Sequence, residues 1–329
     1  MARSELVQVS AGRSVLAGTL TLPDPAATQP GARIPAVLLL PSWLPRGRDG
    51  GWDRVGHPAW FAPAPTDDAG QPRGLLARIA DALAEAGVAS LRCDPRGCGA
   101  SDGSWGETDL FTRIDDARDM LAFLRADPRL DLRRTGLFGH GEGATLALAV
   151  AGGDAVISAL TLVGAPARGF ASVLRAGVAH RSRTGTDRHH PLVAAIDGWS
   201  EDLIERAERG EPVFRLPLPG GERVPLSLAW VEQSIRTPLR ALATIVDRST
   251  SLVHGAADAW SDPAECALLA EALRTAGSSV ERRLLPGCGH DLEEASDGVI
   301  GEIAADLADR LQPRDLPPVL VAIEQMGIG

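Results

Sequence analysis

The eight residues Leu137-Phe138-Gly139-His140-Gly141-Glu142-Gly143-Ala144 join an apolar run to an Ala- and Leu-rich stretch. The apolar run predicts a buried strand, and the Ala- and Leu-rich stretch predicts a helix. Three glycines at alternate positions predict a sharp turn between the two, because glycine adopts positive φ angles without a steric penalty. The stretch therefore predicts a strand that passes through a tight turn directly into a helix.

The same alternation of strand and helix runs through most of the chain. Two segments at residues 6–9 and 15–22 predict an N-terminal antiparallel hairpin. Beyond it, apolar runs at residues 35–40, 88–92, 135–138, 156–163, 251–253 and 280–285 alternate with amphipathic stretches at 75–86, 111–125, 144–151, 263–276 and 299–311. Together these patterns predict an α/β fold, with a mostly parallel central sheet covered by helices on both faces.

The turn around Gly141 also matches a catalytic motif. In the G-x-S-x-G nucleophile elbow a serine stands between strand and helix, and the acid and the histidine follow later in the chain. This chain has His-Gly-Ala-Ala-Asp at residues 254–258, then Gly-Cys-Gly-His-Asp at residues 287–291. Residues 94–103 look like the D-x-R-G-x-G-x-S-x-G loop that follows the fourth strand in one group of such proteins. From these motifs the chain resembles the α/β-hydrolase superfamily, and within it the capped bacterial esterases and dienelactone-hydrolase-like proteins.

The resemblance implies catalytic residues and one departure from the family. His290 corresponds to the catalytic histidine, and Asp258 to the acid that orients it. Gly141 stands at the nucleophile position, where the serine is absent.

The resemblance also implies a domain organisation. An α/β-hydrolase core is expected in two parts, residues 1–169 and 248–329, around an insertion at residues 170–247. Helical runs at residues 192–209 and 226–243 predict that this insertion is a helical cap over the active site. A Trp-rich loop at residues 43–72 is expected to form a wall of the pocket.

An oxyanion hole is expected from backbone N–H groups on two loops. In the elbow motif one donor is the residue after the nucleophile, here Glu142, and the other comes from the loop after the third strand. That loop reads Pro-Ser-Trp in this chain, which departs from the family, and Trp43 is its expected donor. Ser42 is expected to be a turn residue; a side-chain donor or a substitute nucleophile is its alternative role.

Three interpretations of Gly141 stay open. The chain can be a serine-less enzyme in which His290 and Asp258 act as a general base for elimination, cyclisation or isomerisation of a small organic substrate. It can be a serine esterase or acyl hydrolase inactivated by a Ser→Gly change, natural or introduced. It can also be a non-catalytic ligand-binding protein. The pairing of Asp258 with His290 favours an enzyme, because a buried aspartate is costly to keep without a partner.

Composition and motifs limit the binding partners, cofactors and cellular location that we expect. The net charge of −10 is spread along the chain, which argues against nucleic acid or a membrane and for a small, largely apolar substrate. No P-loop, no dinucleotide-binding glycine motif and no Cys or His cluster of metal-ligand spacing is present, so neither a cofactor nor a metal is expected. The N-terminus lacks the apolar region of a signal peptide and no stretch could span a bilayer, so a cytoplasmic location is expected.

Overall fold

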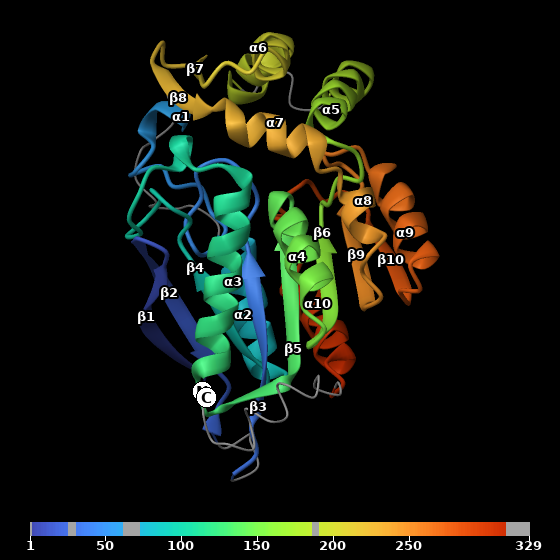
Figure 1. The fold of residues 1–329 in the computed structure, drawn as a ribbon. Coiled ribbons are helices and arrows are strands. Elements are labelled where there is room, and N and C mark those ends of the chain that lie inside the picture. Colours follow the sequence, from blue (N-terminus) through green and yellow to red (C-terminus); the bar gives the residue numbers. More distant parts are fainter. Residues whose placement is uncertain (1, 26–30, 62–72, 186–190, 314–329) are drawn as a thin grey trace.

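The central feature of the molecule is an eight-stranded sheet (Figure 1). The computed structural model describes residues 2–25, 31–61, 73–185 and 191–313. In sheet order the strands are β1 (Arg3–Ala11), β2 (Ser14–Leu22), β4 (Ala89–Cys93), β3 (Ile34–Leu40), β5 (Leu130–His140), β6 (Ile157–Val163), β9 (Ser249–Gly255) and β10 (Val280–Leu285). β2 pairs antiparallel with both β1 and β4, whereas the neighbours from β4 to β10 all run parallel. The predicted N-terminal hairpin and mostly parallel sheet are confirmed.

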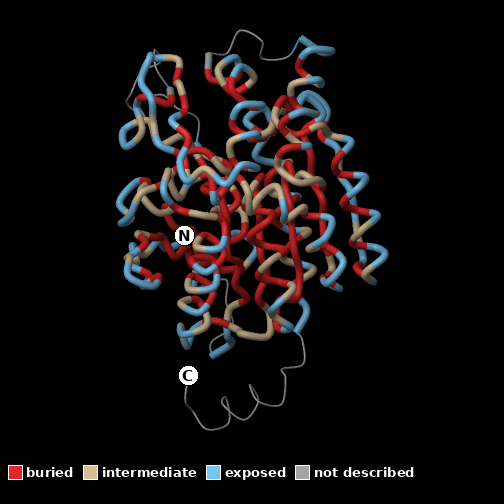
Figure 2. The backbone as a smooth tube through the Cα atoms, turned by 45° about the horizontal axis from the view of Figure 1, so that its top comes forward, coloured by how far each residue is buried: buried red, intermediate tan, exposed pale blue. Residues whose placement is uncertain are grey.

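Apolar side chains fill both faces of this sheet. Along β3, Leu38 and Leu40 belong to the core layer on one face, and Val37 and Leu39 belong to the layer on the other. Successive side chains of a strand point to opposite faces, so an uninterrupted apolar run serves two core layers at once. Figure 2 shows the result as a buried centre surrounded by exposed helix faces and loops.

Helices cover the two faces of the sheet. On one face α2 (Leu75–Glu85) packs against α10 (Asp297–Arg310), and the other face carries α3 (Leu110–Ala126), α4 (Glu142–Gly153), α8 (Leu239–Ala243) and α9 (Glu265–Thr275). A short helix α1 (Pro58–Phe61) and a 3-10 turn η2 (Trp105–Glu107) lie in the connections. Asp109 begins α3 by accepting a hydrogen bond from the N–H of Thr112 at 2.8 Å. Within the described residues, no helix combines the length and the apolar character needed to cross a membrane.

The insertion at residues 170–247 contains strands as well as helices. Its elements are α5 (Phe170–Thr184), α6 (Pro191–Glu208), β7 (Val213–Pro217), β8 (Arg223–Ser227), α7 (Leu228–Arg236) and α8. β7 and β8 pair as an antiparallel hairpin, which the expectation of a helical insertion did not include. The helix expected over residues 226–243 is divided as well: α7 ends at Arg236, and α8 begins after Pro238. A proline disfavours helical conformation in the preceding residue, and Thr237 has φ of −116° and ψ of 67°.

Candidate active site

The turn between β5 and α4 has a backbone conformation that favours glycine. Gly141 has φ of 54° and ψ of −113°, and a residue with a Cβ is strained in such a conformation by about 1–3 kcal/mol. Gly139 and Gly143 are needed for another reason. A Cβ on Gly143 would lie 2.2 Å from the carbonyl oxygen of Leu40, and a Cβ on Gly139 would lie 2.4 Å from the carbonyl oxygen of Gly143. The three glycines therefore let α4 begin directly against the ends of β3 and β5.

His290 and Asp258 form a hydrogen-bonded pair at the same edge of the sheet. Asp258 follows β9, His290 follows β10, and Nδ1 of His290 lies 2.8 Å from Oδ2 of Asp258. A carboxylate only accepts hydrogen bonds, so Nδ1 of His290 is the donor and Nε2 of the neutral ring is left to accept a proton. Asp258 is fully buried, whereas His290 lines a cavity. This arrangement suits general-base chemistry.

Asp258 is held by several donors besides His290. Its Oδ1 accepts hydrogen bonds from the backbone N–H groups of Trp260 at 2.8 Å and Ser261 at 2.9 Å, and its Oδ2 lies 3.1 Å from Nε2 of His254. Burial alone would raise the pKa of Asp258, but the charge of His290 and the hydrogen bonds of both histidines hold that pKa well below its ordinary value. Burial also opposes protonation of His254, but interactions led by its hydrogen bond to Asp258 raise its pKa to about 10. Asp258 is therefore ionised and fixed in orientation.

His140, the last residue of β5, supports the backbone of His290. Its Nε2–H donates to the carbonyl oxygen of His290 at 3.0 Å, and the two ring centroids are 4.6 Å apart. Burial and the nearby charge of His290 lower the pKa of His140 to about 3, so its ring is neutral near pH 7. Asp291 lies 3.5 Å from the same Nε2 and forms an ion pair with Arg46 at 3.0 Å. The end of β5, through His140, and the loop after β3, through Arg46, therefore both hold the loop that carries His290.

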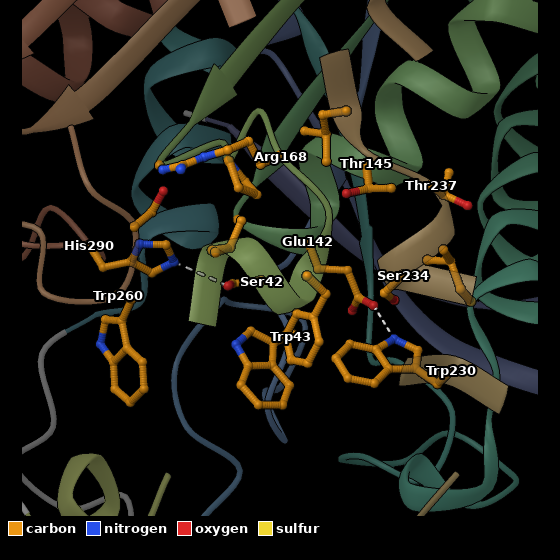
Figure 3. A pocket seen from close by; sticks show the side chains of 18 residues that line it. Ser42, Trp43, Glu142, Thr145, Arg168, Trp230, Ser234, Thr237, Trp260 and His290 are labelled. Carbon is orange, nitrogen blue, oxygen red and sulfur yellow. Dashed lines mark hydrogen bonds between the residues drawn. The ribbon is translucent and has the colours of Figure 1, made fainter. Parts of the chain in front are cut away.

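Ser42 occupies the space in which a side chain on residue 141 would lie. A Cβ on Gly141 would be 2.1 Å from Oγ of Ser42 and 2.9 Å from its Cβ. The same Oγ lies 3.3 Å from Nε2 of His290 (Figure 3). Ser42 is 4% exposed and belongs to the loop after β3. A hydroxyl therefore stands beside Nε2 of His290 although residue 141 has no side chain.

A mostly apolar cavity of about 90 Å³ adjoins these residues. Trp43, from the loop after β3, stacks on Trp230 of α7 with the ring centroids 5.3 Å apart. Phe170 of α5 meets both rings edge-on, at 5.5 Å and 4.8 Å. One wall of the cavity is thus a contact between the core and the insertion. Further lining residues are Leu110, Thr145, Gly164, Pro166, Arg168, Val173, Ser234, Thr237, Leu239, Trp260 and Ser261.

Glu142, at the first turn of α4, is fixed by partners from two other helices. Arg113 of α3 donates to Oε2 at 2.9 Å. Nε1 of Trp230 donates to Oε1 at 2.5 Å, as Figure 3 shows. A carboxylate at this end of a helix is also favoured by the helix dipole. The side chain of Glu142 therefore ties α7 to the core. Its backbone N–H, at the first position of the helix, has no intrahelical partner and stands where the elbow motif has an oxyanion donor.

Two leucines beside the site hold strained backbone conformations. In the described part of the chain, Leu44 with φ of 71° and Leu292 with φ of 51° are the non-glycine residues at positive φ. Leu44 lies two residues after Ser42, Leu292 lies two residues after His290, and both leucines are buried. Such conformations cost about 1–3 kcal/mol and persist where the surroundings impose them, which is common at functional sites. The loops that carry Ser42 and His290 are therefore firmly held.

The structure brings together all the site residues expected from the sequence. Gly141, Glu142, Ser42, Trp43 and His290 line the cavity, and Asp258 lies behind His290.

The expectation for the loop at residues 43–72 is wrong for two of its tryptophans. Trp52 lies over the guanidinium of Arg46, and Trp60 packs edge-on against Trp105, so neither lines the cavity. Residues 62–72 lie outside the described part of the chain.

Sequence reasoning missed three residues that shape the site. His254 was recognised as part of a motif but given no role, although its spacing of four residues from Asp258 was a usable signal. Trp230 and Phe170 lie in the insertion, where an aromatic residue on a helix is more often explained by packing alone. Nothing in the sequence pattern pairs them with Trp43.

Two groups of side chains have the residue types of metal ligands. Among the described residues, Asp53, His57 and Cys98 bring ligand atoms within 4.8 Å of one another, and so do His140, His290 and Asp291. In the first group Nε2 of His57 lies 2.8 Å from the carbonyl oxygen of Gly97. In both groups a histidine nitrogen therefore already hydrogen-bonds the backbone, which accounts for its orientation without a metal.

Comparisons with known proteins agree with the fold. Residues 70–191 match the family model Hydrolase_4, described as serine aminopeptidase, S33. No curated protein matches the chain. Among solved structures, Est1E from Butyrivibrio proteoclasticus, with ferulic acid bound, is 14% identical with a TM-score of 0.59, covering 91% of this chain and 96% of its own. The esterase domain of a Rhodothermus marinus protein is 18% identical with a TM-score of 0.57, covering 93% and 97%.

A third similar structure is DcsB in complex with its substrate analogue. It is 18% identical with a TM-score of 0.61, and the match covers 94% of this chain and 99% of that one. At these identities the likeness concerns the fold. The chain has the α/β-hydrolase fold, with an eight-stranded, mostly parallel sheet flanked by helices.

Proposed function

We propose that this protein is an enzyme that hydrolyses a small, largely apolar carboxylic ester, with His290 as general base and Asp258 as its orienting acid. The orientation of His290 carries the proposal: Asp258 holds Nδ1 at 2.8 Å, and Nε2 lies 3.3 Å from a hydroxyl at the wall of an apolar cavity. A histidine held in this way can remove a proton from a hydroxyl near neutral pH. The matching family model and the esterases of similar fold favour acyl compounds as substrates.

The insertion at residues 170–247 acts as a cap in this proposal, over a core formed by residues 1–169 and 248–329. Two contacts support this role, the stack of Trp43 on Trp230 and the hydrogen bond from Trp230 to Glu142. They join the insertion to two parts of the core beside His290, the loop after β3 and the first turn of α4. A pocket enclosed in this way favours apolar groups on the ester and limits the access of water.

The crowding beside Gly141 argues against an esterase that has merely lost its elbow serine. A Ser→Gly change in an otherwise unaltered site would leave an unfilled space next to residue 141. Instead, both heavy atoms of the Ser42 side chain lie within 3 Å of where a Cβ would be. We therefore infer that the site functions with glycine at position 141.

A second candidate reaction is removal of a proton from the substrate itself, leading to elimination, cyclisation or isomerisation. The observation that favours it is the glycine at the elbow, which leaves Nε2 of His290 facing the cavity with no nucleophile on residue 141. The two reactions differ in their products, because only ester hydrolysis consumes water and releases one carboxylic acid per turnover.

The test is hydrolysis of p-nitrophenyl esters of increasing acyl length by the full chain. We expect His290→Ala to lower kcat/KM by about 10³-fold or more, because removal of the catalytic histidine of a serine protease has an effect of at least this size. His180→Ala is the matched control, because His180 lies on α5 and does not line the cavity. Equal rates for wild type and His290→Ala would contradict the proposal. Failure of the wild type to hydrolyse any ester, with ligand affinity indifferent to His290 and Asp258, would indicate a binding protein.

A further inference from the structure

We propose that Ser42, on the loop after β3, is the nucleophile of this enzyme and replaces the serine absent from position 141. This inference rests on the proposed ester hydrolysis and adds a covalent acyl-enzyme to it. The elbow motif carries its nucleophile between a strand and the following helix, which here is position 141. Ser42 belongs to the loop after β3, so the proposed nucleophile comes from a different segment than in the elbow motif. His290 and Asp258 keep the positions of the base and the acid.

The position of the Ser42 side chain is the first argument. Its Oγ lies 2.1 Å from the place where a Cβ on residue 141 would be, so an elbow serine would have to share the same volume. The hydroxyl of Ser42 therefore stands where the fold normally presents its nucleophile, although the backbone that carries it differs.

The relation of Ser42 to the base is the second argument. Its Oγ lies 3.3 Å from Nε2 of His290, and Asp258 holds the other nitrogen of that ring. A nucleophile, a base within hydrogen-bond reach and a third group that orients the base form the arrangement that activates a serine. A distance slightly longer than an ideal hydrogen bond is common without substrate and shortens when the substrate binds.

Cys98 and Cys288 are less suitable nucleophiles, and neither lines the cavity. Cys98 is buried, and burial raises its pKa to about 12, so the thiol is not ionised near neutral pH. Burial also raises the pKa of Cys288. Among the described side chains, Ser42 is the hydroxyl that hydrogen-bonds the free nitrogen of His290.

The oxyanion hole can serve either position of the nucleophile. In the elbow motif the donors are the N–H after the nucleophile and an N–H from the loop after β3. With the serine at position 42, Trp43 becomes the residue after the nucleophile, and Glu142 supplies the second donor from the start of α4. The two N–H groups exchange roles without a change of place, so moving the serine does not require a new hole.

The proposed reaction proceeds in two balanced steps. Oγ of Ser42 attacks the ester carbonyl carbon while Nε2 of His290 takes the hydroxyl proton, and the tetrahedral intermediate collapses as His290 returns that proton to the leaving alcohol. Water then attacks the acyl group on Ser42 and gives one proton to His290. Collapse releases the carboxylic acid, and the proton on His290 returns to Oγ of Ser42. No metal, oxidant or cofactor is consumed in this sequence.

The test is covalent labelling of the chain of residues 1–329 with a fluorophosphonate, followed by mapping of the modified peptide by mass spectrometry. We expect one phosphonyl group on Ser42 in the wild type and no label in Ser42→Ala or His290→Ala. Ser200→Ala is the matched control, because Ser200 is similarly buried, with 3% exposed, but lies on α6 away from the cavity. We also expect Ser42→Ala to lower kcat for p-nitrophenyl esters by about 10³-fold or more.

The outcomes separate this inference from the function on which it rests. Wild type that is unlabelled, or labelled at another residue, overturns the role of Ser42. The same conclusion follows if Ser42→Ala keeps more than about a tenth of the wild-type kcat while His290→Ala is inactive, and in that case general-base hydrolysis still stands. If both variants hydrolyse esters at the wild-type rate, the proposed function fails as well. Mapping on the wild type makes the result independent of whether a variant folds.

Discussion

Replacing Gly141 with alanine tests whether Ser42 fills the space beside the elbow. The new Cβ has two separate costs. At φ of 54° the backbone is strained for a residue with a side chain, by about 1–3 kcal/mol. Contacts of 2.1 Å and 2.9 Å with Ser42 force a local rearrangement, and such overpacking costs about 1–3 kcal/mol more. We therefore expect Gly141→Ala to lower the free energy of unfolding by about 2–6 kcal/mol.

Removing the Ser42 side chain should eliminate the cost of overpacking and leave the cost of backbone strain. In a Ser42→Gly background both contacts with Ser42 are absent, and Nε2 of His290 at 3.0 Å is the remaining close neighbour of the new Cβ. Gly141→Ala should then cost little more than the backbone strain of about 1–3 kcal/mol. In a Ser42→Ala background the Cβ at 2.9 Å remains and the cost should be intermediate. The coupling energy between positions 42 and 141 is thus expected to be about 1–3 kcal/mol.

The assay is urea unfolding followed by circular dichroism for the wild type, both single variants and the double variant. Gly87→Ala is the control for strain without crowding, because Gly87 has φ of 78° and nothing within 4 Å of a Cβ. A coupling energy below about 0.5 kcal/mol would mean that the two positions are independent. That result would refute the conclusion that Ser42 occupies the elbow space.

Three further predictions follow from the neighbours of the site. Asp258→Asn should lower kcat for ester hydrolysis by about 10⁴-fold, because the amide no longer fixes the tautomer of His290, and steady-state kinetics on the folded variant would check this. The pKa of His254 is raised from 6.5 to about 10 on folding, so its stabilisation is complete below pH 6.5 and is lost as the pH rises through 10. In His254→Asn the unfolding free energy should therefore fall less between pH 6.5 and pH 10 than in the wild type. Parallel plots of unfolding free energy against pH for the two proteins would contradict the raised pKa of His254. Trp230→Phe keeps an aromatic ring on Trp43 but removes the donor to Glu142. We expect the free energy of unfolding to fall by about 1.5–3 kcal/mol. An unchanged midpoint and slope of urea unfolding would contradict this prediction.

Much of the fold could be predicted from local patterns. The run that forms β3 is apolar at every position of Val37 to Leu40, which indicates a strand covered on both faces, and the structure has it at the centre of the sheet. The insertion was less predictable. β8 is a short strand of five residues that ends directly before α7. Because Leu226 of β8 precedes the apolar residues of α7 so closely, the sequence suggested one continuous helix. Pro238 was the overlooked signal for a break.

The site was predictable only in part, because its residues meet through the tertiary structure. The motifs indicated His290, Asp258 and Gly141 from their order along the chain. The contact between Ser42 and position 141 has no such pattern, since it depends on how closely β3 and β5 approach at their ends. Sequence alone therefore left Ser42 as a turn residue with a catalytic alternative. The distances from its Oγ to Nε2 of His290 and to the Cβ position of residue 141 support the catalytic alternative.

The stacked rings of Trp43 and Trp230 join the loop that carries Ser42 to the insertion. Trp43 is the next residue after Ser42, and Trp230 belongs to a helix of the insertion. The residue next to Ser42 is therefore packed against the insertion as well as against the core. In the proposed mechanism, α7 thus supports the loop that carries the nucleophile in addition to lining the pocket.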